Sequence, residues 1–346
     1  MEQNVSKAQR VTLKLIAERA GVDVSTVSRA LSGSKRVKSE TMEEIQKLAH
    51  QLNYRPNELA RGLVTQKTST VGVIVPEVSN SFYSGVLMSI EKELTAGGYS
   101  MILGLSHYRT ETEQHCLDLF LSKRVDGLIS FSTILLGQGE YSGLGSTVPA
   151  VLVDFKDSAQ DVDLVASDNA YGVQLAVDHL VALGHQKIAF VTDDVTTGAR
   201  LRAFQAHTQR HGLECSQFVV QVEKKYEEGG YSSIGRLFQS GELPTAVFFA
   251  NDYMALGGLK ALEERGLSVP GDVSVIGFDD STLLDYLVRS ITTVRQPKHL
   301  LGERAAKLLL RRMEEAGEGI SGPRERVIIT PELIVRDSTG PCRTED

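Results

Sequence analysis

From Thr70 onward, short apolar runs alternate with helical stretches, and this alternation constrains the fold more than any other feature. The predicted strands are Thr70–Pro76, Ser100–Gly104, Gly127–Phe131, Ala150–Asp154, Lys187–Val191, Ala246–Ala250 and Val273–Gly277. The predicted helices are Tyr83–Ala96, Glu111–Lys123, Ala170–Leu183, Arg200–His211, Tyr253–Glu264 and Lys298–Glu315. Such alternation predicts parallel sheets with helices on both faces. Because these units exceed one sheet of usual size, we predict two doubly wound subdomains whose strand ends face a common cleft.

The N-terminal residues 11–52 carry a different pattern, with apolar side chains at the spacing of short helices. We predict helices over Leu13–Ala20 and Val24–Leu31, and a third that begins at Ser39. Gly21 stands where the chain must turn sharply, and glycine does so at low steric cost. Small residues at a helix crossing and glycine at the turn are what a helix-turn-helix requires. The pattern alone leaves open a small helical bundle that does not bind DNA.

Charge is distributed unevenly along the chain. The 346 residues have a net charge of -7, yet residues 1–66 contain 11 Lys and Arg against 7 Asp and Glu. A basic head on an acidic body suits a DNA-binding module joined to a sensor domain. The length predicts two or three domains.

Several classes of protein are disfavoured by what the sequence lacks. It has no apolar run of about 18 residues, and its first thirty residues do not form a signal-peptide pattern. Cys116, Cys215 and Cys342 lie far apart without metal-ligand spacing, so we expect free thiols in a reducing cytoplasm and no metal site. Phosphate-binding glycine motifs and a G-x-S-x-G elbow are missing, so we do not expect an enzyme.

Two strings, Val11–Leu31 and Leu52–Leu63, closely resemble the helix-turn-helix and hinge helix of the lac/galactose repressor (LacI/GalR) family. The resemblance implies major-groove or phosphate contacts by Thr12, Leu13, Val24, Ser25, Ser28, Arg29 and Ser32. It implies further that Asn57 and Ala60 lie at the minor groove, where Leu63 wedges into a base step and kinks the duplex. Asp23 departs from the Ser or Thr common at this turn, and is unfavourable near phosphates unless it caps the second helix.

The remaining chain, to about Ser338, resembles the core of the same family, which is similar in fold to periplasmic sugar-binding proteins. The matching strings are Val71–Pro76, Asn80–Tyr83, Lys123–Ile129, His179–His185, Asn251–Gly257, Val269–Asp280 and Ile291–Pro297. By this resemblance, sugar hydroxyls are held by Asp154, Arg202, Asn251 and Asp279. Tyr226 covers a sugar face, and Phe82 and Tyr83 line the near wall. Asp and Asn at strand ends also cap helices, and this alternative remains open.

The resulting fold class is α/β. An all-α helix-turn-helix domain and a hinge helix precede two doubly wound parallel-sheet subdomains of the periplasmic-binding-protein type. The expected boundaries are 1–55 for the DNA-binding domain, 56–69 for the hinge and linker, and 70–338 for the effector-binding and dimerisation domain. Within that domain we expect one subdomain from roughly 70–165 with 295–325, and the other from 166–290 with 326–338. Residues 339–346 are predicted to be a disordered tail.

These features predict a ligand-responsive transcription regulator, a repressor of carbohydrate-utilisation genes. The expected partners are double-stranded operator DNA, a small-molecule effector that is a sugar or sugar derivative, and a second copy of the chain. A dimer is expected because one helix-turn-helix reads only a few base pairs. A tetramer is not expected, since no C-terminal heptad helix is present. We expect no other cofactor, no membrane association, and a place on the bacterial nucleoid in the cytoplasm.

An alternative within the same family is control by a phosphorylated carrier protein as co-repressor. The predicted helix Lys298–Glu315 carries four cations suited to a phosphoserine, Arg304, Lys307, Arg311 and Arg312. Such a run is also typical of a solvated helix face.

Overall fold

The computed structural model describes residues 11–34, 36–54, 67–131, 148–154, 162–193, 198–239, 243–320 and 322–343. The chain divides into two units, Met1–Thr68 and Ser69–Asp346. Among the described helices, none is long and apolar enough to cross a membrane.

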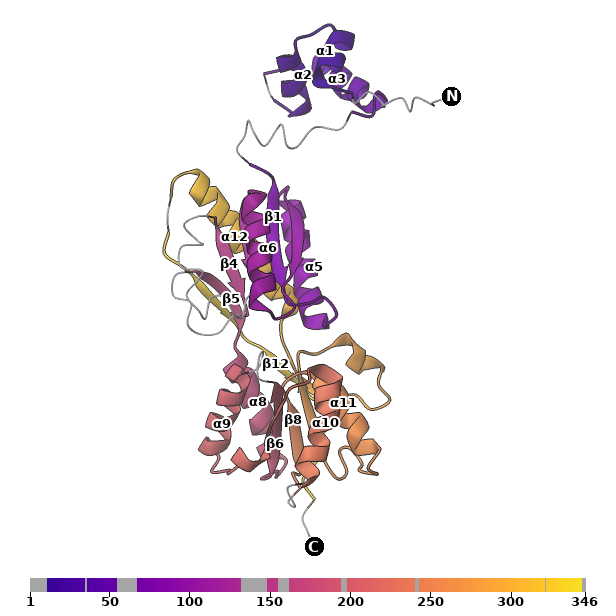
Figure 1. Ribbon diagram of the computed structural model, residues 1–346, viewed down its shortest axis with the longest axis vertical. Helices are drawn as coiled ribbons and strands as arrows, with labels where there is room; N and C mark the ends of the chain where they lie inside the picture. Colours follow the sequence, from indigo (N-terminus) through magenta and orange to yellow (C-terminus); the bar gives the residue numbers. More distant parts are fainter. Residues whose placement is uncertain are drawn as a thin grey trace. The chain divides into compact units, whose positions relative to one another are not determined.

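The N-terminal unit is built from α1 (Leu13–Ala20), α2 (Val24–Leu31) and α3 (Ser39–Gln51). Gly21 ends α1 in the left-handed conformation with φ of 66°, which allows the tight turn into α2. The three helices meet over a small core of buried side chains. This core consists of Ile16, Ala17, Val27, Ala30, Ile45 and Ala49. The predicted helix-turn-helix is therefore confirmed (Figure 1).

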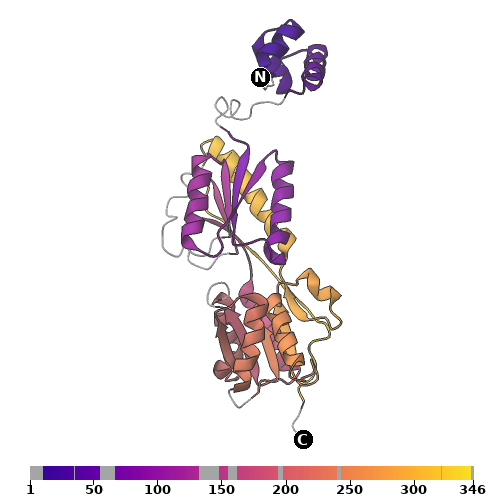
Figure 2. The same ribbon diagram turned by 45° about the vertical axis from the view of Figure 1, so that its right-hand side comes forward.

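The first sheet of the second unit has the strand order β11-β5-β4-β3-β1-β2 within the described residues. Its strands are β1 (Thr70–Val75), β2 (Ser100–Leu105), β3 (Gly127–Ser130), β4 (Ala150–Val153), β5 (Asp163–Ser167) and β11 (Arg326–Ile329). All of its pairings are parallel. Helices α5 (Ser81–Ala96) and α12 (Lys298–Gly317) cover one face, and α6 (Thr110–Ser122) covers the other (Figure 2).

The second sheet has the order β12-β10-β9-β8-β6-β7 within the same part of the chain. Its strands are β6 (Ile188–Asp193), β7 (Val219–Val222), β8 (Ala246–Phe249), β9 (Ser274–Phe278), β10 (Thr292–Arg295) and β12 (Glu332–Ile334). Its helices are α8 (Asn169–Ala182), α9 (Gly198–Arg210), α10 (Tyr226–Gln239) and α11 (Asp252–Glu263), with short turns η2 (Ser216–Phe218) and η3 (Thr282–Tyr286). Helices α8 and α9 pack on one face, and α10 and α11 on the other (Figure 1). Two doubly wound subdomains are thus observed, as predicted.

Near the C-terminus, the chain passes from the first subdomain to the second at a later residue than expected. Residues 326–338 were expected in the second subdomain, but β11 pairs in parallel with β5 of the first sheet. The chain crosses only after Ile329, where β12 joins β10 in the second sheet. Parallel pairing with the buried β5 keeps β11 in the first subdomain.

The predicted disorder of the tail is wrong for its described part, through Arg343. Ser338 is fully buried, and its hydroxyl donates to the Val275 carbonyl at 2.6 Å. Beyond it, the Cys342 amide donates to the Leu183 carbonyl at 2.8 Å, and the Gly340 carbonyl lies 3.0 Å from His185 Nε2. The tail is ordered by hydrogen bonds to side chains distant in the sequence.

A buried ion pair joins α12 to the start of β5. The Arg312 guanidinium donates to both carboxylate oxygens of Asp163 at 2.9 Å, and Asp163 is fully buried. Buried charges are tolerated only when paired, so this contact holds the helix against the sheet.

We predict that Arg312→Ala lowers the free energy of unfolding of the second unit by about 3 kcal/mol, because it leaves the Asp163 carboxylate short of its main partner. Arg311→Ala is the matched control. Its ion pair with Glu325 is exposed, so the loss should stay below about 1 kcal/mol. Urea unfolding followed by circular dichroism measures both. Equal losses in the two variants would contradict the account.

Candidate functional site

One face of the N-terminal unit presents the side chains expected to meet DNA. Val24, Ser25, Ser28, Arg29 and Ser32 are exposed on α2 or at its end, while Val27 and Ala30 are buried beneath them. The spacing leaves one side of α2 free to enter a groove.

The flanking residues have more local roles. Thr12 is exposed and caps α1, since its hydroxyl accepts from the Leu15 amide at 3.3 Å. Leu13 is half-buried. Asp23 occupies the N-cap position of α2 but makes no side-chain capping bond. The hinge residues Asn57, Ala60 and Leu63 lie outside the described residues.

In the second unit, a pocket lies where the carboxyl ends of the two sheets meet. It is lined by Asn80, Phe82, Tyr83, Tyr108, Asp154, Arg200, Tyr226, Asn251 and Asp279. The first five belong to the first subdomain and the last four to the second. The cavity is small, about 40 Å³. Six of the seven effector residues expected from sequence come together here.

Arg202 is the exception, and its assignment to the pocket is corrected. It is exposed on α9, whereas Arg200 is buried and lines the pocket. Two positions along a helix rotate a side chain by about 200°, so the two arginines point to opposite sides. Arg200 and Arg202 are both present in this part of the sequence. The rotational orientation of α9 determines which of the two side chains reaches the pocket.

The Arg200 guanidinium is bound from three directions. Its Nε donates to Asn169 Oδ1 at 2.8 Å, Nη1 donates to the Ala250 carbonyl, and Nη2 lies 3.4 Å from Asp279 Oδ1. The Phe278 ring stacks below it, with its centroid 3.7 Å from the guanidinium carbon. These contacts hold the cation rigidly at the floor of the pocket.

The carboxyl groups of Asp154 and Asp279 both interact electrostatically with Arg200. Burial raises the pKa of Asp154 to about 6, although nearby Arg200 acts to lower it. Burial also raises the pKa of Asp279, again against Arg200 and against a 2.7 Å hydrogen bond from Gln296. Asn169 donates to Asp154 Oδ1 at 3.3 Å and so links that carboxyl to the guanidinium. Carboxyl, amide and guanidinium groups on the floor of one pocket can donate hydrogen bonds to a hydroxyl-rich solute and accept hydrogen bonds from it.

Asn251 both lines the pocket and caps α11, because its side-chain oxygen accepts from the Met254 amide at 2.9 Å. The capping alternative raised from the sequence thus applies to Asn251. Asp279 has a φ of 110°, which non-glycine residues rarely adopt, and its carboxylate faces Arg200 and Gln296.

Sequence reasoning missed Asn80, Tyr108, Asn169 and Arg200 as site residues. Asn80 and Tyr108 follow β1 and β2, at the edge where ligands meet parallel sheets, so their positions after a strand are a signal that could have identified them. Asn169 acts only through its contacts to Arg200 and Asp154, for which the sequence carries no signal.

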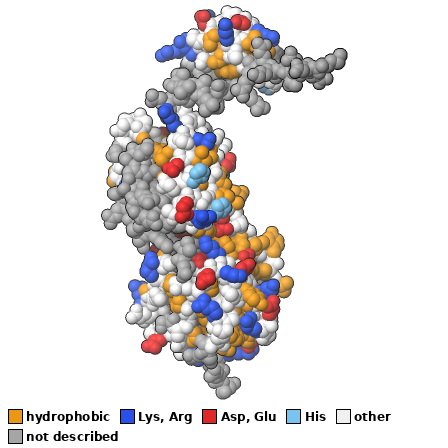
Figure 3. Space-filling view, viewed as in Figure 1, with side chains coloured by type: hydrophobic (Ala, Val, Ile, Leu, Met, Phe, Trp, Pro, Cys, Tyr) orange, Lys and Arg blue, Asp and Glu red, His pale blue; other side chains and the backbone are white. Residues whose placement is uncertain are grey.

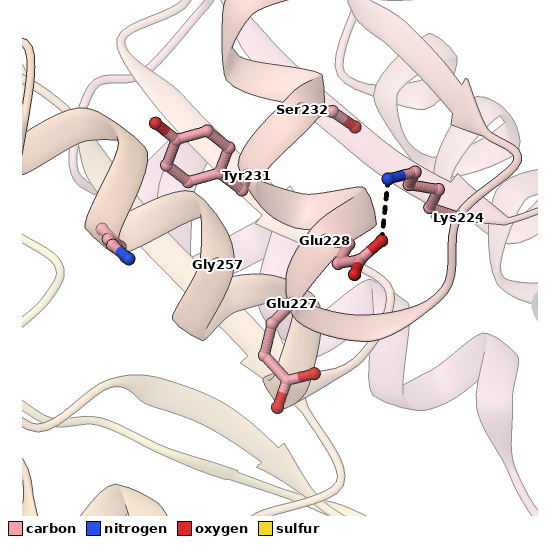
Figure 4. A pocket seen from close by; sticks show the side chains of 7 residues that line it. Lys224, Glu227, Glu228, Tyr231, Ser232 and Gly257 are labelled. Carbon is pink, nitrogen blue, oxygen red and sulfur yellow. Dashed lines mark ion pairs between the residues drawn. The ribbon is translucent and has the colours of Figure 1, made fainter.

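A wider surface groove lies between α10 and α11, lined by Lys224, Glu227, Glu228, Tyr231, Ser232, Gly257 and Lys260 (Figure 4). Its volume is about 390 Å³. Lys224 pairs with Glu228 at 2.8 Å, so those charges neutralise each other at the surface. The small pocket between the sheets, with its buried polar floor, is the better candidate for a ligand site.

The cations of α12, considered above for a phosphoserine, are largely engaged in ion pairs. Lys307 pairs with Glu303 at 2.7 Å, Arg311 with Glu325 at 2.6 Å, and Arg312 is buried against Asp163. Arg304 lines a shallow pocket beside Lys307 and Arg311. In the described structure these pairings favour a structural role for the helix face.

Comparison with known proteins decides the family. A model for bacterial regulatory proteins of the lacI family matches residues 12–57, and one for a periplasmic binding protein-like domain matches residues 177–339. The HTH-type transcriptional repressor PurR of Haemophilus influenzae (strain PittEE) is 34% identical over 332 residues, covering 94% of this chain and 98% of the relative. The chain belongs to the lacI family. It is a DNA-binding transcription regulator that responds to a ligand.

Other relatives also span most of this lacI-family regulator. Catabolite control protein A of Priestia megaterium is 34% identical over 310 residues, covering 88% of this chain and 93% of the relative. The crystal structure of the lac repressor dimer bound to operator and the anti-inducer ONPF has a TM-score of 0.85 at 26% identity. It covers 96% of this chain and 100% of the lac repressor chain.

The raised pKa of Asp154 predicts a pH dependence in this regulator. Between its ordinary value of 3.8 and about 6, the folded state holds a proton that the unfolded state has released. The free energy of unfolding therefore falls as pH rises through this window. Asp154→Asn removes this contribution, so the variant should be more stable than the wild type above pH 6, with the difference vanishing near pH 4.

Urea unfolding midpoints from pH 4 to pH 8 measure the effect. Asp118→Asn, on the exposed side of α6, makes the same chemical change outside the pocket and is the control. An Asp154→Asn variant less stable than the wild type at pH 8 would count against burial as the dominant cause.

Proposed function

We propose that this protein is a repressor of carbohydrate-utilisation genes whose hold on its operator is set by a sugar or sugar derivative bound between its two subdomains. The observation that carries the proposal is the polar floor of the pocket, where Arg200, Asp154, Asp279 and Asn251 converge beneath aromatic side chains. Such a mixture of donors and acceptors suits hydroxyl recognition. An operator on the chromosome would be bound in the bacterial cytoplasm.

Two similar structures that contain a bound sugar support a sugar effector. One is the transcriptional regulator CelR–cellobiose complex, 29% identical, covering 95% of this chain and 100% of that chain, with a TM-score of 0.69. The other is a LacI family transcriptional regulator from Enterococcus faecium with bound ribose, 28% identical, covering 79% of this chain and 100% of that chain, also with a TM-score of 0.69.

For DNA, we propose that the exposed face of α2 enters the major groove, with Thr12 and Leu13 at its edge. Asn57 and Ala60 are proposed to lie at the minor groove, and Leu63 to act as a wedge. Phosphate contacts supply affinity and base-edge contacts supply specificity.

A homodimer is part of the proposal, because two helix-turn-helix units are needed to read a pseudo-palindrome. Large apolar side chains are exposed on both subdomains, as an interface requires. Met88 on α5 is 69% exposed, and Tyr286 and Val288 in or after η3 are 87% and 109% exposed. Hydrophobic side chains are also visible over this part of the surface (Figure 3). Sedimentation equilibrium tests the dimer, and a monomer at operator-binding concentrations would refute it.

Ser28→Asp should weaken operator binding by about tenfold or more, because it places a carboxylate on the DNA-facing side of α2. Gel shifts with a duplex selected from a random pool measure the affinity. Gln46→Asp adds the same charge on α3 and is the control. Equal loss in both variants would contradict the assigned face.

Arg200→Ala should weaken effector binding by about tenfold or more, since a charged donor at the floor is lost, while Arg202→Ala should leave it unchanged. A thermal-shift screen of sugars, sugar acids, sugar phosphates and purines identifies a ligand, and calorimetric titration measures its affinity. Loss of binding in Arg202→Ala but not in Arg200→Ala would overturn the arrangement described for α9.

A further inference from the structure

Helix α2 carries a large apolar side chain that its own unit does not bury. Among the described residues of the N-terminal unit, Val24 is the only large hydrophobic residue that is exposed, at 43%. Val27 and Leu31 of the same helix are buried in the helical core or pack against it. Val24 therefore lies outside that core and is available to a partner of the unit.

A single exposed valine is ordinary on a protein surface, but the position of this one is informative. Val24 is the first residue of α2, and the first residues of a recognition helix approach base edges in the major groove. Ser25 follows it, and Ser28 lies one helical turn further along on the same side, both exposed. Because these neighbours are short, the proposed DNA-facing side of α2 can approach the bases closely around Val24.

The chemistry of valine restricts what it can recognise in the major groove. Its side chain neither donates nor accepts hydrogen bonds, whereas the base edges present donors and acceptors at every pair. Thymine adds an apolar group, the C5 methyl, and contact between that methyl and Val24 removes apolar surface of both from water. Against a polar base edge, the same valine would displace water without replacing its hydrogen bonds, which is unfavourable. Contact with a thymine methyl is therefore the favourable match for Val24.

We propose that Val24 reads the C5 methyl group of a thymine in each operator half-site and thereby specifies one base pair of the sequence. The inference rests on the proposed docking of α2 in the major groove, and it adds the chemical group that this position recognises. Because thymine is the only one of the four bases with that methyl, the contact distinguishes T·A from the other three pairs, including A·T with the strands exchanged.

Deoxyuridine tests the proposal directly, because it pairs with adenine as thymine does and lacks only the C5 methyl. Duplexes selected from a random pool by the full-length protein define the half-site. Each thymine of the half-site is then replaced in turn by deoxyuridine, in both half-sites together, and gel shifts measure the affinity. At one position the replacement should weaken binding about fifteenfold, which corresponds to about fourfold for one buried methyl in each half of the dimer.

Val24→Ala links the methyl to the residue. The variant should fold normally, because Val24 lies outside the core and alanine favours a helix, and circular dichroism checks this. Since two side-chain methyl groups are lost, the penalty for deoxyuridine at the same position should fall to about threefold or less. Arg29→Ala is the matched control, exposed on the same helix. It should weaken binding to thymine and deoxyuridine duplexes alike and keep the fifteenfold ratio between them.

A selected half-site without a fixed thymine would overturn the proposal, as would deoxyuridine duplexes that bind as tightly as the thymine duplex. An undiminished penalty in Val24→Ala would also overturn it, because another side chain would then contact the methyl. In each of these cases the protein still binds a selected duplex, so the proposed function would stand. Failure to select any duplex would instead refute the proposed function, and this inference with it.

Discussion

The contacts of the buried Arg200 guanidinium are the interactions on which the proposed ligand site depends. It connects the start of α8 through Asn169, the end of β8 through the Ala250 carbonyl, and the end of β9 through Asp279. Without this cation, two carboxyl groups would face each other in a site shielded from water, at a cost that burial makes severe. The geometry of the pocket floor and its charge thus follow from one side chain on α9.

In the proposed function, Arg200, Asn251 and Asp279 on this floor belong to the second subdomain, while Asp154 and much of the wall belong to the first. A solute that contacts both must favour one arrangement of the two sheets over others, and it shifts the population toward that arrangement. The N-terminal unit can report the shift only if its hold on DNA differs between arrangements. Family membership supports a regulator of this kind, and the proposed sugar effector and dimer give it a specific form.

The general architecture could be predicted from the sequence, because strand–helix alternation and the spacing around Gly21 are local signals. Helix α10 was missed, since Gly229 and Gly230 weaken the helical pattern. Those glycines are required because a Cβ at Gly230 would lie 1.9 Å from the Met254 carbonyl oxygen of α11. The short strands β5, β7, β10, β11 and β12 were also missed as separate elements, since a polar or charged residue in each interrupts the apolar run.

Site residues could be predicted where they follow a recognisable strand, as with Asp154 and Asp279. They could not be predicted where the orientation of a helix determines which side chain reaches the pocket, as with Arg200 and Arg202. The tail illustrates a third limit, because its order depends on His185, 155 residues away from Gly340 in the sequence. Contacts of that range leave no mark on local composition, so the tail was predicted to be disordered.

In the proposed regulator, the arrangement of the two subdomains and the affinity for DNA are coupled, and coupling between two sites is reciprocal. The most direct measurement is the distance between spin labels on the two subdomains of the otherwise unaltered protein, with a tight-binding operator duplex and with a scrambled duplex. The account predicts that the operator shifts the distribution of distances and that the scrambled duplex does not. Identical distributions with both duplexes, at concentrations where the operator is fully bound, would contradict it.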